Sequence, residues 1–318
     1  MHRRRLFAIA GASLALAGLP LGSPEAQART WRWRGMALGA HAELRLVHED
    51  EKAAKRIIDD AVAELRRLEA VFSLYDPGSA LSRLNREGQL DAPPFELLAV
   101  LAEARQVHDL TAGAFDVTVQ PLWQLYLAHF AGGATTPPPG EAVAAALART
   151  GMARVAFDSR RIVLGEPGMA LTLNGIAQGA IADRIAQLLE AAGIADTLVD
   201  TGEIKALGRR PDGRLWQVGL ADPEGGPPLA VELSGGAIAT SSPAGTIFEP
   251  TGRFHHLIDP RTGYPATGGP AQVSVQAASA MRADALSTAL SVLPAGEARR
   301  LVATGSLGSE RVWLLPRA

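Results

Sequence analysis

The segment 280–293 limits the possible folds most, because it is apolar on nearly every side. Ala, Leu, Met and Val fill most of its positions. A helix of this composition is stable only when other elements cover it all round. We therefore expect a helix at the centre of the molecule, surrounded by other secondary structure.

The rest of the chain alternates helical and strand patterns. Apolar residues at 3-to-4 spacing predict an amphipathic helix at 51–72. Further helices are expected at 94–110, 141–148, 174–192 and 296–304, and strands within 31–46 and 197–240 and at 154–157, 161–164, 170–173, 272–276 and 311–315. Interleaved helices and antiparallel strands predict an α+β unit with two lobes and a cleft.

Composition excludes several classes of protein. The 318 residues are 47% hydrophobic with a formal net charge of -2, so a full core is available and a nucleic-acid or polybasic membrane surface is disfavoured. The chain has no cysteine. A disulfide scaffold, a thiolate metal site, a thiol nucleophile and an acylated lipoprotein anchor are therefore excluded.

Residues 1–28 have the pattern of an export signal. Arg3, Arg4 and Arg5 precede a short apolar segment, and Ala26-Gln27-Ala28 is a small-x-small cleavage site. Paired arginines before Leu-Phe resemble a twin-arginine signal, with a Sec signal as the alternative. We expect a mature chain, 29–318, in the periplasm, exported by this signal peptide and without a lipid anchor.

The central helix carries a candidate metal site. Asp284 lies in its interior, where an unpaired carboxylate is costly, and Thr288 follows four residues later on the same face. A carboxylate and a hydroxyl are hard oxygen ligands that suit Mg²⁺ better than Zn²⁺. The alternative is that Asp284 pairs with a buried arginine such as Arg261 or Arg184.

A histidine before a tight turn is the candidate base. Residues 255–258 alternate polar and apolar groups like the end of a half-buried strand, and residues 259–263, Asp-Pro-Arg-Thr-Gly, predict a turn. An imidazole held there suits a base beside an anionic ligand. The alternative is a structural turn with a satisfied histidine.

Two glycine-containing segments and three aromatic residues are weaker candidates. Residues 174–179 lie between an expected strand and helix, and residues 235–242 combine glycines with hydroxyls; both could bind phosphate. The alternatives are a plain strand-to-helix connection and a hairpin turn. Tyr75, Phe115 and Trp123 could stack on a planar ring, although such aromatics are more often part of a core.

Taken together, these segments resemble the FAD:protein FMN transferase family, also called the ApbE or thiamine-biosynthesis-lipoprotein family. The resemblance covers essentially the whole mature chain. It rests on Met36 with Gly39, Ser73-Leu74-Tyr75 with residues 79–85, Gly113 to Thr118, Asn174 to Gly179, Asp200-Thr201-Gly202, Ala239-Thr240-Ser241, His256 to Gly263 and Ala283 to Ala289.

The resemblance implies an ApbE-like, T-fold-related domain with a flavin cleft between two lobes. It implies an enzyme, an FAD:protein FMN transferase, that uses Mg²⁺ and FAD as substrate. The FMN phosphate passes to a Thr or Ser hydroxyl of a target protein through a phosphoester bond, and AMP is released. His256 matches the base that activates the acceptor, and the metal ligands match Asp284, Thr288 and a carbonyl at Gly175. The flavin-contacting segments match Met36, Tyr75, Ala114, Phe115, Asp116, Thr172, Gln178 and Ile258.

The sequence also departs from the family pattern. Thr172 stands where the family commonly has an acidic residue, Gln178 replaces a lysine, and Gly202-Glu203 replaces a Gly-Gly pair. Together with the export signal, these three departures resemble the exported branch of the family that is linked to nitrous-oxide respiration. Members of that branch act on a membrane-bound electron-transfer partner. The alternatives are a Mg²⁺-dependent FAD pyrophosphatase giving FMN and AMP, or a non-catalytic exported flavin-binding or delivery protein.

Overall fold

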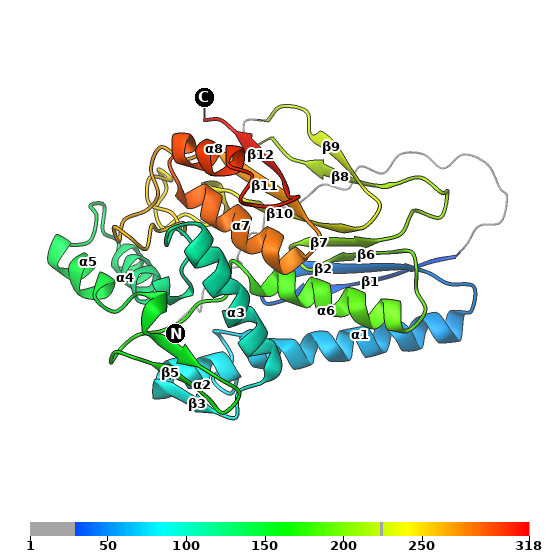
Figure 1. The fold of residues 1–318 in the computed structure, drawn as a ribbon, viewed down its shortest axis with the longest axis horizontal. Helices are drawn as coiled ribbons and strands as arrows, with labels where there is room; N and C mark the ends of the chain where they lie inside the picture. Colours follow the sequence, from blue (N-terminus) through cyan, green and yellow to red (C-terminus); the bar gives the residue numbers. More distant parts are fainter. Residues whose placement is uncertain (1–28, 223–224, 318) are drawn as a thin grey trace.

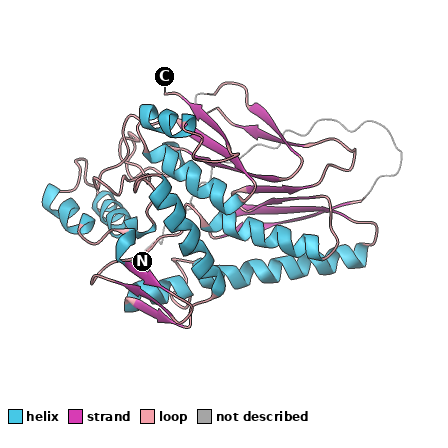
Figure 2. Cartoon of the chain, in the orientation of Figure 1, coloured by secondary structure: helices cyan, strands magenta, loops and turns pink. Residues whose placement is uncertain are grey.

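A computed structural model describes residues 29–222 and 225–317, and its main feature is a seven-stranded antiparallel sheet (Figures 1 and 2). The expected export signal, 1–28, lies outside the described residues. In spatial order the strands are β1 (Thr30–Ala37), β2 (Ala40–Val47), β6 (Thr197–Asp200), β7 (Ile204–Leu207), β10 (Gly236–Ser241), β11 (Gln272–Ala277) and β12 (Arg311–Leu315). Every neighbouring pair of these strands is antiparallel.

Three helices cover one face of this sheet. α1 (Glu51–Phe72) lies over β1 and β2, α6 (Ala177–Ala191) over β6 and β7, and α7 (Ala280–Val292) over β10 and β11. The bounds of α1 match the expected helix because its apolar spacing is regular and Asp50 caps its start by accepting from the Ala53 N–H. α7 is enclosed by the sheet, by α6 and by α3 (Phe95–Leu110), so the expectation of a buried central helix is confirmed.

A two-stranded hairpin covers part of the opposite face. It consists of β8 (Trp216–Leu220) and β9 (Leu229–Leu233). Trp216, Val218 and Leu233 pack there with Leu198 and Ile238 of the main sheet. The sheet therefore has apolar layers on both faces.

The remaining elements form a smaller lobe beside α3 (Figure 1). It contains a three-stranded sheet of β3 (Gln89–Asp91), β5 (Arg161–Leu164) and β4 (Val155–Phe157), with α2 (Ala80–Glu87), the one-turn helix η1 (Val117–Val119), α4 (Gln120–Ala131) and α5 (Gly140–Leu147). α8 (Ala295–Ala303) follows α7 and packs on β12. The predicted α+β class with mostly antiparallel sheets is confirmed.

Two expected strands are wrong. Residues 170–173 join no sheet, because the Asn85 side chain binds both the N–H (2.7 Å) and the carbonyl (2.8 Å) of Leu171, where a neighbouring strand would otherwise pair. Residues 255–258 contain only isolated bridges, from His255 to Ile247 and from Ile258 to Pro265. The expected helix at 174–192 begins only at Ala177, after a turn.

No helix among residues 29–222 and 225–317 combines the length and the apolar character that crossing a membrane requires.

Candidate active site

One pocket gathers most of the candidate residues from distant parts of the chain. It lies where η1, α4, the start of α6, the C-terminal end of β10, the connection 242–271 and α7 meet. Its lining includes the predicted residues Ala114, Phe115, Asp116, Thr172, Gly175, Gln178, His256, Ile258, Asp284 and Thr288. His256 and Asp284 are far apart in sequence, and the fold brings them to one cavity.

Two predicted flavin contacts lie elsewhere. Met36 is 48% exposed and Tyr75 is 59% exposed, and neither lines the pocket. Phe115 and Trp123, the other two aromatic candidates, do line it. Contact of Met36 or Tyr75 with a flavin stays a prediction.

Asp284 is a buried acidic side chain without a positive partner among the residues that the structure describes. It is 3% exposed, and its Oδ2 accepts the backbone N–H of Gly179 at 3.2 Å. Burial raises the pKa of Asp284 to about 8, against a smaller lowering by this hydrogen bond. A carboxyl in this state is either protonated or balanced by a bound cation.

The alternative of an arginine partner for Asp284 is wrong. Arg261 forms two hydrogen bonds with Asp259, at 2.9 and 2.8 Å, and Arg184 binds Glu64 at 2.7 Å. Within the described part of the chain, no Lys, Arg or His forms an ion pair with Asp284. An ion pair with a described residue therefore does not explain this buried carboxyl.

The glycines of 174–179 allow a close approach of α6 to α7. A Cβ on Gly175 would lie 2.8 Å from Thr288 Oγ1, and a Cβ on Gly179 would overlap the Ala280 carbonyl. Only glycine permits this spacing. The segment thus brings its backbone against Asp284 and Thr288, which explains its glycines without a phosphate-binding loop.

The donors around Asp284 fit a hard cation. The Thr288 hydroxyl, the Gly175 backbone and the Ser241 hydroxyl, which is 3.3 Å from Thr288 Oγ1, supply oxygen near the carboxylate. Oxygen donors of this kind suit Mg²⁺ or Ca²⁺. No group of three or more His, Cys, Asp or Glu side chains forms a metal cluster in the described residues, so hydroxyl and carbonyl oxygens must complete such a site.

His256 has the hydrogen bonding of a neutral base. Its Nδ1 lies 3.0 Å from the Thr246 carbonyl, which can only accept, so Nδ1 carries the proton and Nε2 keeps a free lone pair. Burial lowers the pKa of His256, and the bond to Thr246 opposes this only partly. The half-buried ring is therefore neutral near pH 7 and able to accept a proton.

Aromatic packing on α4 holds the connection that carries His256. Tyr126 stacks on Phe248 and Phe254, with ring centroids 6.0 and 6.3 Å away, and its hydroxyl donates to the Gly263 carbonyl at 3.1 Å. Residues 259–263 form the predicted turn, with Gly263 at φ +82°. A side chain there would be strained and would meet Val143 of α5.

His255 has a structural environment instead. It is 2% exposed, does not line the pocket, and its Nε2 lies 3.2 Å from the Ala266 carbonyl. Burial, with a smaller contribution from His256, lowers the pKa of His255 to about 4. Of the two adjacent histidines, only His256 faces the cavity.

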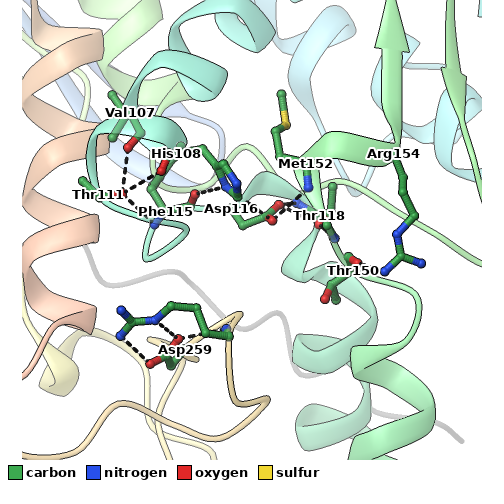
Figure 3. A network of polar contacts seen from close by, with 12 residues as sticks. Val107, His108, Thr111, Phe115, Asp116, Thr118, Thr150, Met152, Arg154 and Asp259 are labelled. Carbon is green, nitrogen blue, oxygen red and sulfur yellow. Dashed lines mark hydrogen bonds and ion pairs between the residues drawn. The ribbon is translucent and has the colours of Figure 1, made fainter.

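Asp116 lines the pocket, but its carboxylate is committed to internal contacts (Figure 3). Oδ1 accepts from the N–H and the hydroxyl of Thr118 at 2.8 and 2.6 Å, and Oδ2 accepts from the Met152 N–H at 3.0 Å. His108 Nδ1 lies 3.5 Å from Oδ2 and 2.9 Å from the Phe115 carbonyl. Asp116 therefore shapes the turn that presents Ala114 and Phe115 to the cavity.

One lining carboxylate, Glu203, was not predicted as a site residue. It lies in the turn between β6 and β7, and burial, followed by the charges of Asp284 and Asp200, raises its pKa well above the usual range. In sequence, the polar run Asp200-Thr201-Gly202-Glu203 looks like an exposed turn. The sequence feature that could have identified Glu203 is the replacement of the family's Gly-Gly pair by Gly202-Glu203.

Comparison with known proteins agrees with this geometry. Residues 38–311 match the model of the ApbE family. The chain belongs to the ApbE family. A protein of Haemophilus influenzae described as FAD:protein FMN transferase is 33% identical over 248 residues, covering 74% of this chain and 72% of the relative. One of Treponema pallidum with the same description is 34% identical over 259 residues, covering 74% and 71%.

Solved structures of the ApbE family share the fold. The apo form of the Pseudomonas stutzeri flavinyl transferase ApbE superposes with a TM-score of 0.79 at 29% identity, over 91% of this chain and 92% of that one. The flavin transferase ApbE from Vibrio cholerae gives 0.78 at 26% identity, over 91% and 95%. The predicted family and its fold are both confirmed.

Proposed function

We propose that this protein transfers FMN from FAD to a Thr or Ser hydroxyl of a target protein and releases AMP. The acceptor oxygen attacks the FMN phosphorus, a new P–O bond forms, and the bond to the AMP phosphate breaks. The family relatives described as FAD:protein FMN transferases support this assignment. Residues 29–318 are the catalytic unit in this proposal.

The proposal rests on one observation: a histidine that can act as a base and an acidic site without a positive partner among the described residues line the same cavity. His256 Nε2 has the lone pair to take the acceptor's proton, while Asp284 and Thr288 face the same cavity from α7. Phosphoryl transfer depends on positioning and charge neutralisation more than on covalent help. This arrangement supplies a base on one side and an acidic, oxygen-rich site on the other.

The acidic site fits Mg²⁺. Asp284, the Thr288 hydroxyl and the Gly175 carbonyl would hold the ion, which supplies neutralisation of the pyrophosphate charge when bound. No lysine or arginine is among the described residues that line the pocket, so the chain itself brings no positive side chain to the phosphates. Phe115, Trp123 and Ile258 offer the apolar surface for the flavin ring.

The acceptor and the location rest on the sequence. The paired arginines and the Ala26-Gln27-Ala28 site indicate export to the periplasm. The acceptor would then be a protein exposed in that compartment, such as a membrane-bound electron-transfer subunit.

A transfer assay tests the proposal. The chain from Arg29 onward is mixed with FAD, Mg²⁺ and a threonine-bearing acceptor peptide, and mass spectrometry looks for an FMN phosphoester. We expect an adduct that disappears with EDTA or with a Thr→Val peptide. Free FMN and AMP without adduct would favour a pyrophosphatase, and intact FAD would favour a flavin-binding protein.

A further inference from the structure

Glu203 is a buried pocket carboxylate that the proposed reaction does not yet use. It is 7% exposed, and its Oε2 accepts the Thr240 N–H at a long 3.3 Å. No other hydrogen bond or ion pair of this side chain occurs among residues 29–222 and 225–317. Glu203 lines the same cavity as Asp284.

The charges around the cavity do not balance. Three carboxylates line it, and only Asp116 has a full set of donors. Glu203 and Asp284 each accept one weak backbone hydrogen bond, and neither pairs with a lysine or arginine of the described residues. Two such groups at one cavity are costly unless a cation lies between or beside them.

The turn of Glu203 is built to bring it there. Asp200 pairs with Ile204 across the turn, the Thr201 N–H donates to the Glu203 carbonyl at 3.1 Å, and Gly202 takes φ +100°. The Thr201 hydroxyl donates to the Gln178 carbonyl at 2.9 Å, which fixes the turn to the start of α6. The same helix start contacts Asp284, so both carboxylates are held by one framework.

We propose that Glu203 is the second carboxylate of the divalent-cation site and that, with Asp284, it balances the two positive charges of the ion. The inference rests on the proposed function, because it concerns the cation of that reaction. Glu203 adds a negative group from the β6–β7 turn to the donors on α7 and α6. The cavity can thereby hold a divalent cation tightly although it has few anionic side chains.

Metal binding without FAD tests this directly. Mn²⁺ is titrated into the protein, and the free ion is measured by electron paramagnetic resonance for wild type, Glu203→Gln and Asp200→Asn. Asp200 is the matched control, because it is an acidic residue of the same turn that does not line the pocket. We expect Glu203→Gln to weaken binding at least about 10-fold, as losses around metal sites commonly do, and Asp200→Asn to change it less than about 3-fold.

Thermal unfolding in EDTA supplies a second readout. Replacing this buried carboxyl, which has only one long hydrogen bond, by a neutral amide should raise the Tm of metal-free Glu203→Gln by about 3 °C, whereas loss of a purely structural hydrogen bond would lower it. Unchanged Mn²⁺ affinity in Glu203→Gln, or a lowered metal-free Tm, would overturn the inference while leaving the proposed transferase in place. If the wild type binds no Mn²⁺, the metal site is refuted both in this inference and in the proposed function.

Discussion

Replacing Asp284 by asparagine should stabilise the metal-free protein while inactivating it. Asp284 is buried, and its environment raises the pKa to about 8 from the ordinary 3.8. The folded state therefore holds a proton that the unfolded state lacks between pH 4 and 8. Stability of the metal-free wild type must fall as the pH rises through this window.

The size of the effect follows from the same pKa. At pH 7, keeping this carboxyl in the folded protein costs as much as about 4 kcal/mol relative to an unfolded chain with the ordinary value. Asparagine has the same shape, carries no charge and can still accept from the Gly179 N–H. Its amide N–H₂ needs a partner, which lowers the net gain to about 2–4 kcal/mol.

Denaturant unfolding in EDTA at pH 5, 7 and 8.5 measures this gain. The excess in free energy of unfolding of Asp284→Asn over wild type should grow with pH. Saturating Mg²⁺ should raise the stability of the wild type and leave that of Asp284→Asn unchanged. Asp183→Asn is the opposite control, because Asp183 of α6 is fully paired with the start of α7 and with Lys205, so its loss should destabilise. An Asp284→Asn protein no more stable than wild type at pH 8.5 in EDTA would refute the reasoning.

Three further changes test the rest of the site. His256→Ala should slow transfer on the order of 10²-fold or more while sparing FAD binding. The wild-type rate should fall only below pH 6.5, because burial lowers the pKa of this base. If His256→Ala also loses FAD binding, the role of His256 is structural. Gly175→Ala would place a Cβ 2.8 Å from Thr288 Oγ1, so we expect weaker Mg²⁺ binding by calorimetry with an unchanged circular dichroism spectrum. His255 has a pKa lowered to about 4, so the unfolded state binds its proton first and stability falls by about 3 kcal/mol as the pH drops from 7 to 4. His255→Gln, which keeps a donor for the Ala266 carbonyl, should remove that acid sensitivity in urea unfolding.

The sequence predicted the parts of the fold whose signals are local. The bounds of α1 follow from apolar spacing and an acidic cap, and the burial of α7 follows from its composition. Asp284 stood out for the same reason, since a carboxylate in an apolar helix requires an explanation. These features depend on neighbours along the chain, which a sequence displays.

The features that were missed depend on distant contacts. Residues 170–173 have a strand-like composition, but Leu171 bonds to the Asn85 side chain and the Thr172 N–H donates to the Val117 carbonyl, which no local pattern reveals. α4 was not predicted, because apolar residues occupy much of its surface and its partners lie on the connection 242–271. Glu203 is buried only because the β6–β7 turn docks on α6.

The two halves of the proposed chemistry reside on different segments of the chain that meet at one cavity. The acidic site belongs to α7 and the start of α6, whereas His256 belongs to the long connection whose two ends are fixed by the paired strands β10 and β11. The residues around His256 are buried, but other positions of this connection, such as Ile247 and Tyr264, are exposed, and exposed loop positions tolerate changes of sequence that packed helices do not. A lineage can therefore exchange the recipient of the flavin by altering these exposed positions and still keep His256 and the acidic site that split the dinucleotide.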